Sequence, residues 1–212
     1  MRVIIYSDVH GNLPAFEAML KAEKGAFDTS ICLGDLVNYG PWSNECVDLA
    51  RSLPHLALLM GNHEEAFLQG AYPGNNELVQ QFFKKTWPGF DRKEEIAAFL
   101  PAYQLAGYTF QHTIQDSYIY PDTQVKLDAS YIIGHSHHQF HYLEGGHQLY
   151  NAGSVGQNRA WINVISYLLM DTETGAVEMR NCVYDVDPVI DRMRALDYPE
   201  SCIAYYTNKK RA

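Results

Sequence analysis

Side chains that can bind metal ions stand directly behind the first apolar run of the chain. Val3–Tyr6 is β-branched and aromatic, has the length of a strand, and is followed by Asp8, His10 and Gly11. Because residues two apart on an extended chain project to the same face, the Asp8 carboxylate and the His10 imidazole can reach one ion. An oxygen and a nitrogen ligand together suit a divalent transition metal. This stretch therefore predicts part of a metal site at a strand end.

The same arrangement recurs twice in the first third of the chain. The run Ser30–Leu33 is followed by Asp35, and the run His55–Met60 is followed by Asn62 and His63. Repeated strand, polar turn and helix is typical of βαβ units, whose sites lie at the carboxyl ends of the strands. The polar groups are therefore expected along one edge of a sheet.

Further histidines end strand-like segments in the second half. His112 ends the segment Tyr108–His112, and His135 and His137 follow the segment Ser130–Gly134. A lone histidine is usually structural, but five of the nine histidines stand at such strand ends. Packing alone does not account for so many histidines at strand ends. We therefore predict that these five histidines belong to the metal site. The remaining histidines are expected at the surface or behind the ligands: His55, His138, His141 and His147.

Hydrophobic periodicity outlines the other elements. Helices are expected at Leu13–Lys24 (capped by Asn12), Ser43–Leu53, Glu77–Trp87, Asp91–Leu100 and Asp187–Tyr206. Further strands are expected at Gln148–Asn151, Val164–Met170 and Ala176–Val183. The close spacing of the strands in the second half favours a second, largely antiparallel sheet packed on the first. Residues 65–100 either pack against the sheet or form a partial lid over the site.

The composition is that of a globular protein. The chain has 212 residues, of which 47% are hydrophobic and 19% charged, enough for one sizeable core. We therefore expect a single domain over residues 1–212. The formal net charge of -9 argues against broad nucleic-acid binding and against a basic membrane-binding surface. No apolar run approaches the roughly 20 residues of a membrane span, so neither a membrane nor a nucleic-acid partner is expected.

Cysteine usage favours a reducing compartment. No Cys-x-x-Cys pair is present, so a zinc ribbon is not indicated. The first apolar run is short and is interrupted by Asp8, which argues against a signal peptide. A thiol-bearing cytoplasmic protein is therefore expected in preference to a disulfide-linked secreted one. The cysteines are Cys32, Cys46, Cys182 and Cys202.

Taken in order, these motifs resemble the signature of the calcineurin-like metallophosphoesterase superfamily. That signature is Asp-x-His, Gly-Asp, Gly-Asn-His-Glu, His and Gly-His-x-His, and the resemblance covers Val3 to about Arg159. Each motif alone is weak, but all of them in this order, each after a strand, form a specific signal. The glycine-rich loop Asn151–Arg159 is also similar to the Asn-Pro-Gly-Ser-Val-Gly loop of small bacterial and archaeal phosphodiesterases.

The resemblance implies a fold and a set of ligands. The fold is α/β, a four-layer αββα sandwich of two mixed sheets flanked by helices. It implies one ion held by Asp8, His10 and His137, a second held by Asn62, His112 and His135, and Asp35 bridging both. His63 resembles the family histidine that contacts the scissile phosphate or protonates the leaving oxygen. Asn62 and Arg159 are the expected substrate contacts, and a solvated loop position without a role is the alternative for Arg159.

The implied reaction is hydrolysis of a small phosphate ester by a hydroxide that bridges two metal ions. Two cations about 3.5–4 Å apart can clamp a phosphoryl group and generate hydroxide at neutral pH. Mixed imidazole and carboxylate ligands suit manganese, iron, zinc or nickel better than magnesium or calcium, and manganese is the first expectation. The enzyme would therefore be a metal-dependent phosphoesterase, and its oligomeric state stays open.

One departure bears on the substrate. Gly34–Gly40 resembles the Gly-Asp-x-Val-Asp-Arg-Gly motif of Ser/Thr protein phosphatases, but Asn38 replaces the acid and Tyr39 replaces the phosphate-binding arginine. A phosphodiester is therefore favoured. The alternatives are a phosphomonoesterase, a protein-phosphatase-like enzyme, a dinucleoside-polyphosphate hydrolase, a nuclease, or a non-catalytic scaffold like the retromer subunit of this fold. The complete ligand set argues against the scaffold. Residues 65–100 and the loop Thr113–Pro121, with Tyr118 and Tyr120, are expected to shape the pocket.

Overall fold

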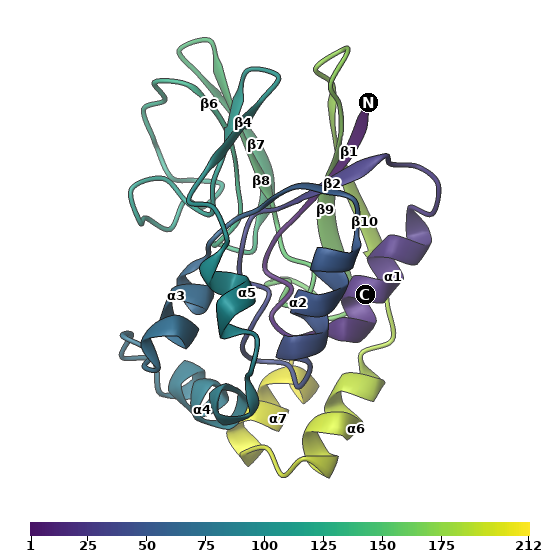
Figure 1. Ribbon diagram of the computed structural model, residues 1–212, viewed down its shortest axis with the longest axis vertical. Coiled ribbons are helices and arrows are strands. Elements are labelled where there is room, and N and C mark those ends of the chain that lie inside the picture. The colour runs from purple at the N-terminus through teal and green to yellow at the C-terminus, as the bar shows by residue number, and fades with distance from the viewer.

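The computed structural model describes residues 1–212 as two five-stranded sheets with helices around them (Figure 1). The first sheet has the order β10-β9-β1-β2-β3, formed by Val177–Val183, Val164–Asp171, Arg2–Tyr6, Thr29–Cys32 and His55–Leu58. The second has the order β4-β5-β6-β8-β7, formed by Tyr103–Leu105, Tyr108–Phe110, Ser130–Ile133, His147–Ala152 and Gln139–Glu144. Both sheets are mixed, which confirms the fold class expected from the sequence.

Seven α-helices accompany the sheets. They are α1 (Leu13–Ala22), α2 (Ser43–Ser52), α3 (Asn62–Gln69), α4 (Glu77–Thr86), α5 (Lys93–Ala97), α6 (Asp187–Ala195) and α7 (Glu200–Thr207). None of these helices is both long enough and apolar enough to span a membrane. Helix α1 begins as expected, because the Asn12 side chain accepts a hydrogen bond from the Ala15 N–H at 3.2 Å.

Strand β1 is buried on both faces, and its side chains alternate between two cores. Ile4 and Tyr6 belong to the large cluster shared with α1, α2, α4 and α7. Val3 and Ile5 belong to a second cluster between the sheets, together with Ile132 of β6. Burial of a large apolar side chain contributes about 1.5–3 kcal/mol, so these two cores hold the first sheet between the helices and the second sheet.

Three expectations about the elements were wrong. Strands β9 and β10 pair with β1 in the first sheet, and the centre of the second sheet, β5-β6-β8, is parallel. The expected helix over 187–206 is divided where Asp197 adopts a positive φ of 53° and Pro199 follows. The expected helix over 91–100 is shorter, because Leu100 pairs with Leu59 as an isolated bridge. In each case a long-range contact or a backbone turn overrides local periodicity.

The loops that follow the strands of both sheets are hydrogen-bonded to one another. The Asp8 N–H donates to the Gly34 carbonyl and the Gly156 N–H donates to the Asp8 carbonyl, each at 3.0 Å. The Gly134 N–H donates to the His112 carbonyl at 3.0 Å. These bonds link the loops after β1, β2, β5, β6 and β8, so the side chains that they carry are held at one end of the sandwich.

Candidate metal centre

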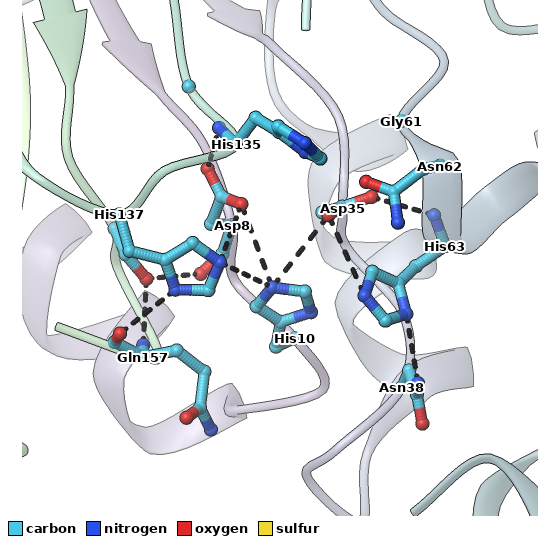
Figure 2. Close-up of polar contacts among 12 residues, drawn as sticks. Asp8, His10, Asp35, Asn38, Gly61, Asn62, His63, His135, His137 and Gln157 are labelled. Atoms are coloured by element: carbon cyan, nitrogen blue, oxygen red, sulfur yellow. Dashed lines mark hydrogen bonds and ion pairs between the residues drawn. The ribbon is translucent and has the colours of Figure 1, made fainter. Parts of the chain in front are cut away.

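The structure brings the predicted ligands together at this end of the molecule (Figure 2). Their donor atoms form overlapping groups in which every atom lies within 4.8 Å of the others. The groups are Asp8, His10 and His137; His10, Asp35 and His63; and Asp35, His112 and His135. All of these side chains are buried, and the remaining four histidines lie outside the groups.

Backbone turns, and not an extended strand, aim these side chains. Strand β1 ends at Tyr6, and the expectation that Asp8 and His10 project from one strand face was therefore wrong. The left-handed region is occupied by Asp8 (φ 56°), His10 (φ 52°), Asp35 (φ 57°), His135 (φ 68°) and His137 (φ 60°). Aspartate and histidine tolerate this conformation better than most residues, but it still costs on the order of 1 kcal/mol or more each. Such strain concentrated at one place is typical of a functional site.

The glycine before Asn62 is required by close packing against Asp35. A Cβ atom on Gly61 would lie 2.2 Å from the Asp35 Oδ1. Any larger residue would push the Asp35 loop away from the start of α3. The Asp35 Oδ1 also accepts a hydrogen bond from the His63 N–H at 2.9 Å, so this contact fixes the carboxylate in place.

Backbone carbonyls determine which ring nitrogen of His10 and His137 is unprotonated. The Nδ1 of His10 lies 3.1 Å from the Val37 carbonyl, and the Nδ1 of His137 lies 2.9 Å from the Gln157 carbonyl. A carbonyl only accepts, so each Nδ1 carries the proton and each Nε2 presents a lone pair. The two Nε2 atoms face each other at 3.2 Å. Lone pairs in this position repel each other unless a cation lies between them.

Asp8 supplies an oxygen to the same space. Its Oδ2 accepts a hydrogen bond from the His135 N–H at 2.9 Å, whereas its fully buried Oδ1 has no hydrogen-bond donor. That Oδ1 lies 3.1 Å from the His137 Nε2 and 3.6 Å from the His10 Nε2. An unsatisfied buried carboxylate oxygen is costly. Asp8, His10 and His137 therefore fit a metal ion.

A second group of donor atoms lies around His112. Its Nδ1 donates to the Leu33 carbonyl at 2.9 Å, so its Nε2 faces the centre. That Nε2 lies 3.2 Å from the Asn62 Oδ1, 3.0 Å from the His135 Nδ1 and 3.3 Å from the Asp35 Oδ2. Two imidazole nitrogens, an amide oxygen and a carboxylate oxygen form a donor set for a transition metal.

Asp35 lies between the two groups. Its Oδ2 is 3.3 Å from the His112 Nε2 and 3.8 Å from the His10 Nε2. A carboxylate in this position can give ligands to ions on both sides. The sequence-based expectation that Asp35 bridges two ions is compatible with this geometry.

Glu64, for which no role was predicted, anchors the Asp35 loop. Its carboxylate accepts hydrogen bonds from the N–H groups of Asp35 and Gly61 (2.7 and 3.0 Å) and of Leu36 and Val37 (2.7 and 3.2 Å). Four backbone donors on one buried carboxylate hold the turn in a single conformation. The only signal in the sequence was its position three residues after Gly61, where a glutamate can satisfy the start of a helix.

Burial keeps two of the candidate ligands neutral. It lowers the pKa of His135 and of His137 to about 4, so both carry a free lone pair at neutral pH. For His112, burial acts to lower the pKa, but the Asp35 carboxylate outweighs it and raises the pKa to about 10. Burial acts to raise the pKa of Asp35, but His112 and His63 outweigh it and hold that pKa below its usual range. Without metal, His112 and Asp35 therefore form an ion pair.

His63 stands beside the ligands but is held differently. Its Nδ1 lies 2.8 Å from the Asn38 Nδ2, and its Nε2 lies 4.0 Å from the Asp35 Oδ2. The Asn38 Oδ1 accepts a hydrogen bond from the Tyr39 N–H at 2.8 Å, which fixes the orientation of the amide. Asn38 therefore donates to the His63 Nδ1, and the His63 proton resides on Nε2. Burial lowers the pKa of His63 to about 3, so the ring is neutral at pH 7.

Two cavities open onto the centre and share Asn62 and His135. The first, named here the tyrosine lobe, has a volume of about 190 Å³ and is lined by Tyr39, Tyr72, Tyr118, Tyr205, His63 and Arg159 among others. The second, named here the acidic lobe, has a volume of about 470 Å³ and is lined by Met60, Glu65, Phe99, Pro101, Thr113 and Asp116 among others. A group bound at Asn62 and His135 can therefore extend into either cavity.

The walls of the tyrosine lobe come from three separate segments. Tyr72 stacks on His63 with ring centroids 5.4 Å apart, so residues 65–100 form part of the wall. Tyr118 lies 3.9 Å from the His135 ring, in the loop expected to shape the pocket, and Tyr120 packs behind it. Tyr205 on α7 was not anticipated, because nothing in the C-terminal sequence marks it as close to the motifs.

Arg159 also lines the tyrosine lobe. It is exposed, and its Nη1 donates to the Tyr205 hydroxyl oxygen at 2.9 Å. No other lysine or arginine lines this lobe. Tyr39, which replaces the phosphate-binding arginine of the protein phosphatases, is buried with its ring 4.7 Å from that of His10. Arg159 is therefore the one cationic side chain available to a bound anion there.

Comparisons with known proteins agree with this fold. A sequence model of the calcineurin-like phosphoesterases matches residues 1–119. An uncharacterized protein of Methanocaldococcus jannaschii is 29% identical, over 93% of this chain and 94% of the relative. Among solved structures, a metallophosphoesterase from Sphaerobacter thermophilus has a TM-score of 0.81 with 24% identity over 98% of both chains. A hypothetical protein from Pyrococcus horikoshii OT3 has a TM-score of 0.82 with 17% identity over 97% of both chains. The chain belongs to the calcineurin-like phosphoesterase family.

Proposed function

We propose that the protein is a phosphodiesterase that uses two divalent transition-metal ions. Asp8, His10 and His137 would hold one ion, Asn62, His112 and His135 the other, and Asp35 both, with manganese as the first choice. The observation that carries this proposal is the pair of bare Nε2 atoms of His10 and His137, 3.2 Å apart beside the unsatisfied Asp8 oxygen. When bound, such ions supply activation of water and stabilisation of charge on the phosphoryl oxygens.

His63 is proposed to act as a hydrogen-bond donor. Because Asn38 donates to its Nδ1, the Nε2–H points into the site beside Asp35. A neutral imidazole in this state donates a hydrogen bond to the leaving oxygen or to a phosphoryl oxygen as charge develops. Of the two roles open to this histidine from the sequence, contact with the scissile group is therefore favoured over transfer of a proton.

Two features favour a diester over a monoester. A monoester dianion carries one more negative charge than a diester and is best bound by a further fixed cation. The position of the phosphate-binding arginine in the Gly34–Gly40 segment is occupied by Tyr39, which is buried and neutral. The one lysine or arginine that lines the tyrosine lobe is the exposed Arg159. In addition, the cavities on both sides of Asn62 and His135 give room for two ester substituents.

The test compares kcat/KM for bis-p-nitrophenyl phosphate and p-nitrophenyl phosphate with manganese, and after treatment with EDTA as control. Faster, metal-dependent hydrolysis of the diester is expected. A clear preference for the monoester would overturn the substrate class. Tight manganese binding without hydrolysis of either compound would favour the scaffold alternative. The physiological substrate is proposed to be a small phosphate ester in the cytoplasm, which the unpaired state of all four cysteines supports.

A further inference from the structure

The two lobes differ in charge. The tyrosine lobe is lined by the exposed Arg159 as well as by the buried carboxylate of Asp35. In the acidic lobe the exposed carboxylates of Glu65 and Asp116 face the cavity, and no lysine or arginine lines it. Neither carboxylate has an ion-pair partner. The acidic lobe therefore disfavours an anionic substituent and leaves two negative charges available to a cation.

The acidic lobe also has an apolar wall. Met60, Phe99 and Pro101 line it beside the two acids, and Phe99 is 7% exposed. An aromatic ring, a thioether and carboxylates together suit an alkylated ammonium group, whose methyl groups pack on the apolar wall while its charge faces the acids. A neutral sugar or alkyl group would use only one half of this surface.

The position of His63 assigns an ester substituent to each lobe. His63 lines the tyrosine lobe and not the acidic lobe. With His63 as the donor to the leaving oxygen, the alcohol that leaves is the one in the tyrosine lobe, and the retained alcohol lies in the acidic lobe. In the step, a water oxygen adds to phosphorus and the bond to the leaving oxygen breaks. The electron pair departs with that oxygen, which takes up a proton derived from the water. The products are one alcohol and the phosphomonoester of the retained alcohol.

We propose that the retained alcohol is an alkylated ammonium alcohol, so that the substrate class is a phosphodiester of an amino alcohol with a second, aromatic or anionic, substituent. This inference rests on the proposed phosphodiesterase function and adds the identity of one substituent. The geometry that supports it is the placement of Glu65, Asp116 and Phe99 around one cavity that shares Asn62 with the tyrosine lobe but is not lined by Arg159.

The test uses two diesters that differ only in charge. p-Nitrophenyl phosphorylcholine carries a trimethylammonium group, and p-nitrophenyl 3,3-dimethylbutyl phosphate is its neutral isostere. With manganese, kcat/KM is expected to be roughly five- to tenfold higher for the choline ester, the size of one or two solvent-exposed ion pairs. In the double variant Glu65→Gln, Asp116→Asn this ratio should fall close to one. Glu94→Gln on the outer face of α5 removes an exposed acid that lines neither lobe, and it should retain the ratio.

A binding measurement provides a readout independent of turnover. Calorimetry with the products, phosphorylcholine and 3,3-dimethylbutyl phosphate, should show the same preference and the same loss in the double variant. Equal kcat/KM for the two diesters, or a ratio that the double variant leaves unchanged, overturns the inference while the phosphodiesterase proposal stands. If none of the three diesters, these two and bis-p-nitrophenyl phosphate, is hydrolysed, the phosphodiesterase proposal itself is contradicted.

Discussion

Asn38 donates a hydrogen bond to His63, which is the reverse of the direction in an aspartate–histidine pair. The Asn38 Nδ2 lies 2.8 Å from the His63 Nδ1, and the Asn38 Oδ1 is occupied by the Tyr39 N–H. An aspartate at position 38 would instead accept a proton from Nδ1. The replacement therefore changes which nitrogen of His63 carries the proton, and with it what His63 offers to a substrate.

The substitution Asn38→Asp should move the His63 proton to Nδ1. The aspartate accepts from Nδ1, so that this nitrogen becomes protonated in place of, or in addition to, Nε2. Long-range ¹H–¹⁵N correlation spectra of the metal-free protein report the protonation of each nitrogen directly. Asn44→Asp is the matched control, because Asn44 bonds to Gly89 and Asp91 at a distance from His63. A His63 Nδ1 that is already protonated in the wild type would contradict the assignment.

His63→Ala should lower the rate without removing metal. Loss of one preorganised hydrogen-bond donor costs about 10²–10³-fold in kcat, whereas the ligands His10, His112 and Asp35 stay in place. The loss should be smaller for methyl p-nitrophenyl phosphate than for methyl phenyl phosphate, because a nitrophenolate leaves with less need of a donor. Manganese content measured by elemental analysis should remain near that of the wild type. A variant that loses one equivalent of metal would show that His63 is a ligand.

The metal-free protein should lose stability between pH 6.5 and 4. Burial lowers the pKa of His63 to about 3 and that of His135 and His137 to about 4. In the unfolded chain these histidines take up protons near pH 6.5, so that lowering the pH favours unfolding. His112, with a pKa raised to about 10, stays protonated in the folded protein over this window. Burial and the Asp35 carboxylate raise the pKa of Glu64 to about 7, so Glu64 takes up a proton in the folded protein and offsets part of the loss.

The expected decrease in the free energy of unfolding is on the order of a few kcal/mol, because each pKa unit corresponds to about 1.4 kcal/mol. Urea denaturation in EDTA at pH 7, 6, 5 and 4 measures it. His55 is exposed and provides the control, since His55→Asn should leave the slope with pH unchanged. A free energy of unfolding that stays constant over this window would contradict the neutral, buried state of these histidines.

The sequence predicted that the candidate ligands lie together, because each follows a strand in a short motif. Asp35, His112 and His135 could be placed at a common edge from the strand ends alone. The way in which Asp8 and His10 meet could not be predicted correctly, because it depends on left-handed backbone turns after β1 and not on the strand itself.

What escaped prediction depends on contacts between distant segments. The pairing of β9 with β1 joins residues more than a hundred positions apart, and local periodicity contains no information about it. Tyr205 reaches the site only because α7 packs on α4. The difference in charge between the two lobes likewise arises from residues on separate segments, Glu65 and Asp116 in the acidic lobe and Arg159 in the tyrosine lobe.

Arg159→Ala should affect monoesters more than diesters. Arg159 is the one cationic side chain in the tyrosine lobe, and its attraction to a dianion exceeds that to a monoanion. We expect kcat/KM for p-nitrophenyl phosphate to fall roughly tenfold, the effect of about 1.4 kcal/mol, and that for bis-p-nitrophenyl phosphate to fall less. Arg51→Ala, at an exposed position that lines neither lobe, is the control. An equal loss for both substrates would assign Arg159 to general steering of anions.

The central claim is that one carboxylate, Asp35, is shared by two metal ions. The most direct measurement is the stoichiometry and affinity of manganese, determined by calorimetry and elemental analysis on the metal-stripped wild type and on Asp35→Asn. We expect about two ions per wild-type chain and weaker binding of both in the variant, because an amide has one good ligand oxygen and no charge. Circular dichroism should show an unchanged fold. A wild type that binds no transition metal, or a variant that keeps both ions at wild-type affinity, would contradict it.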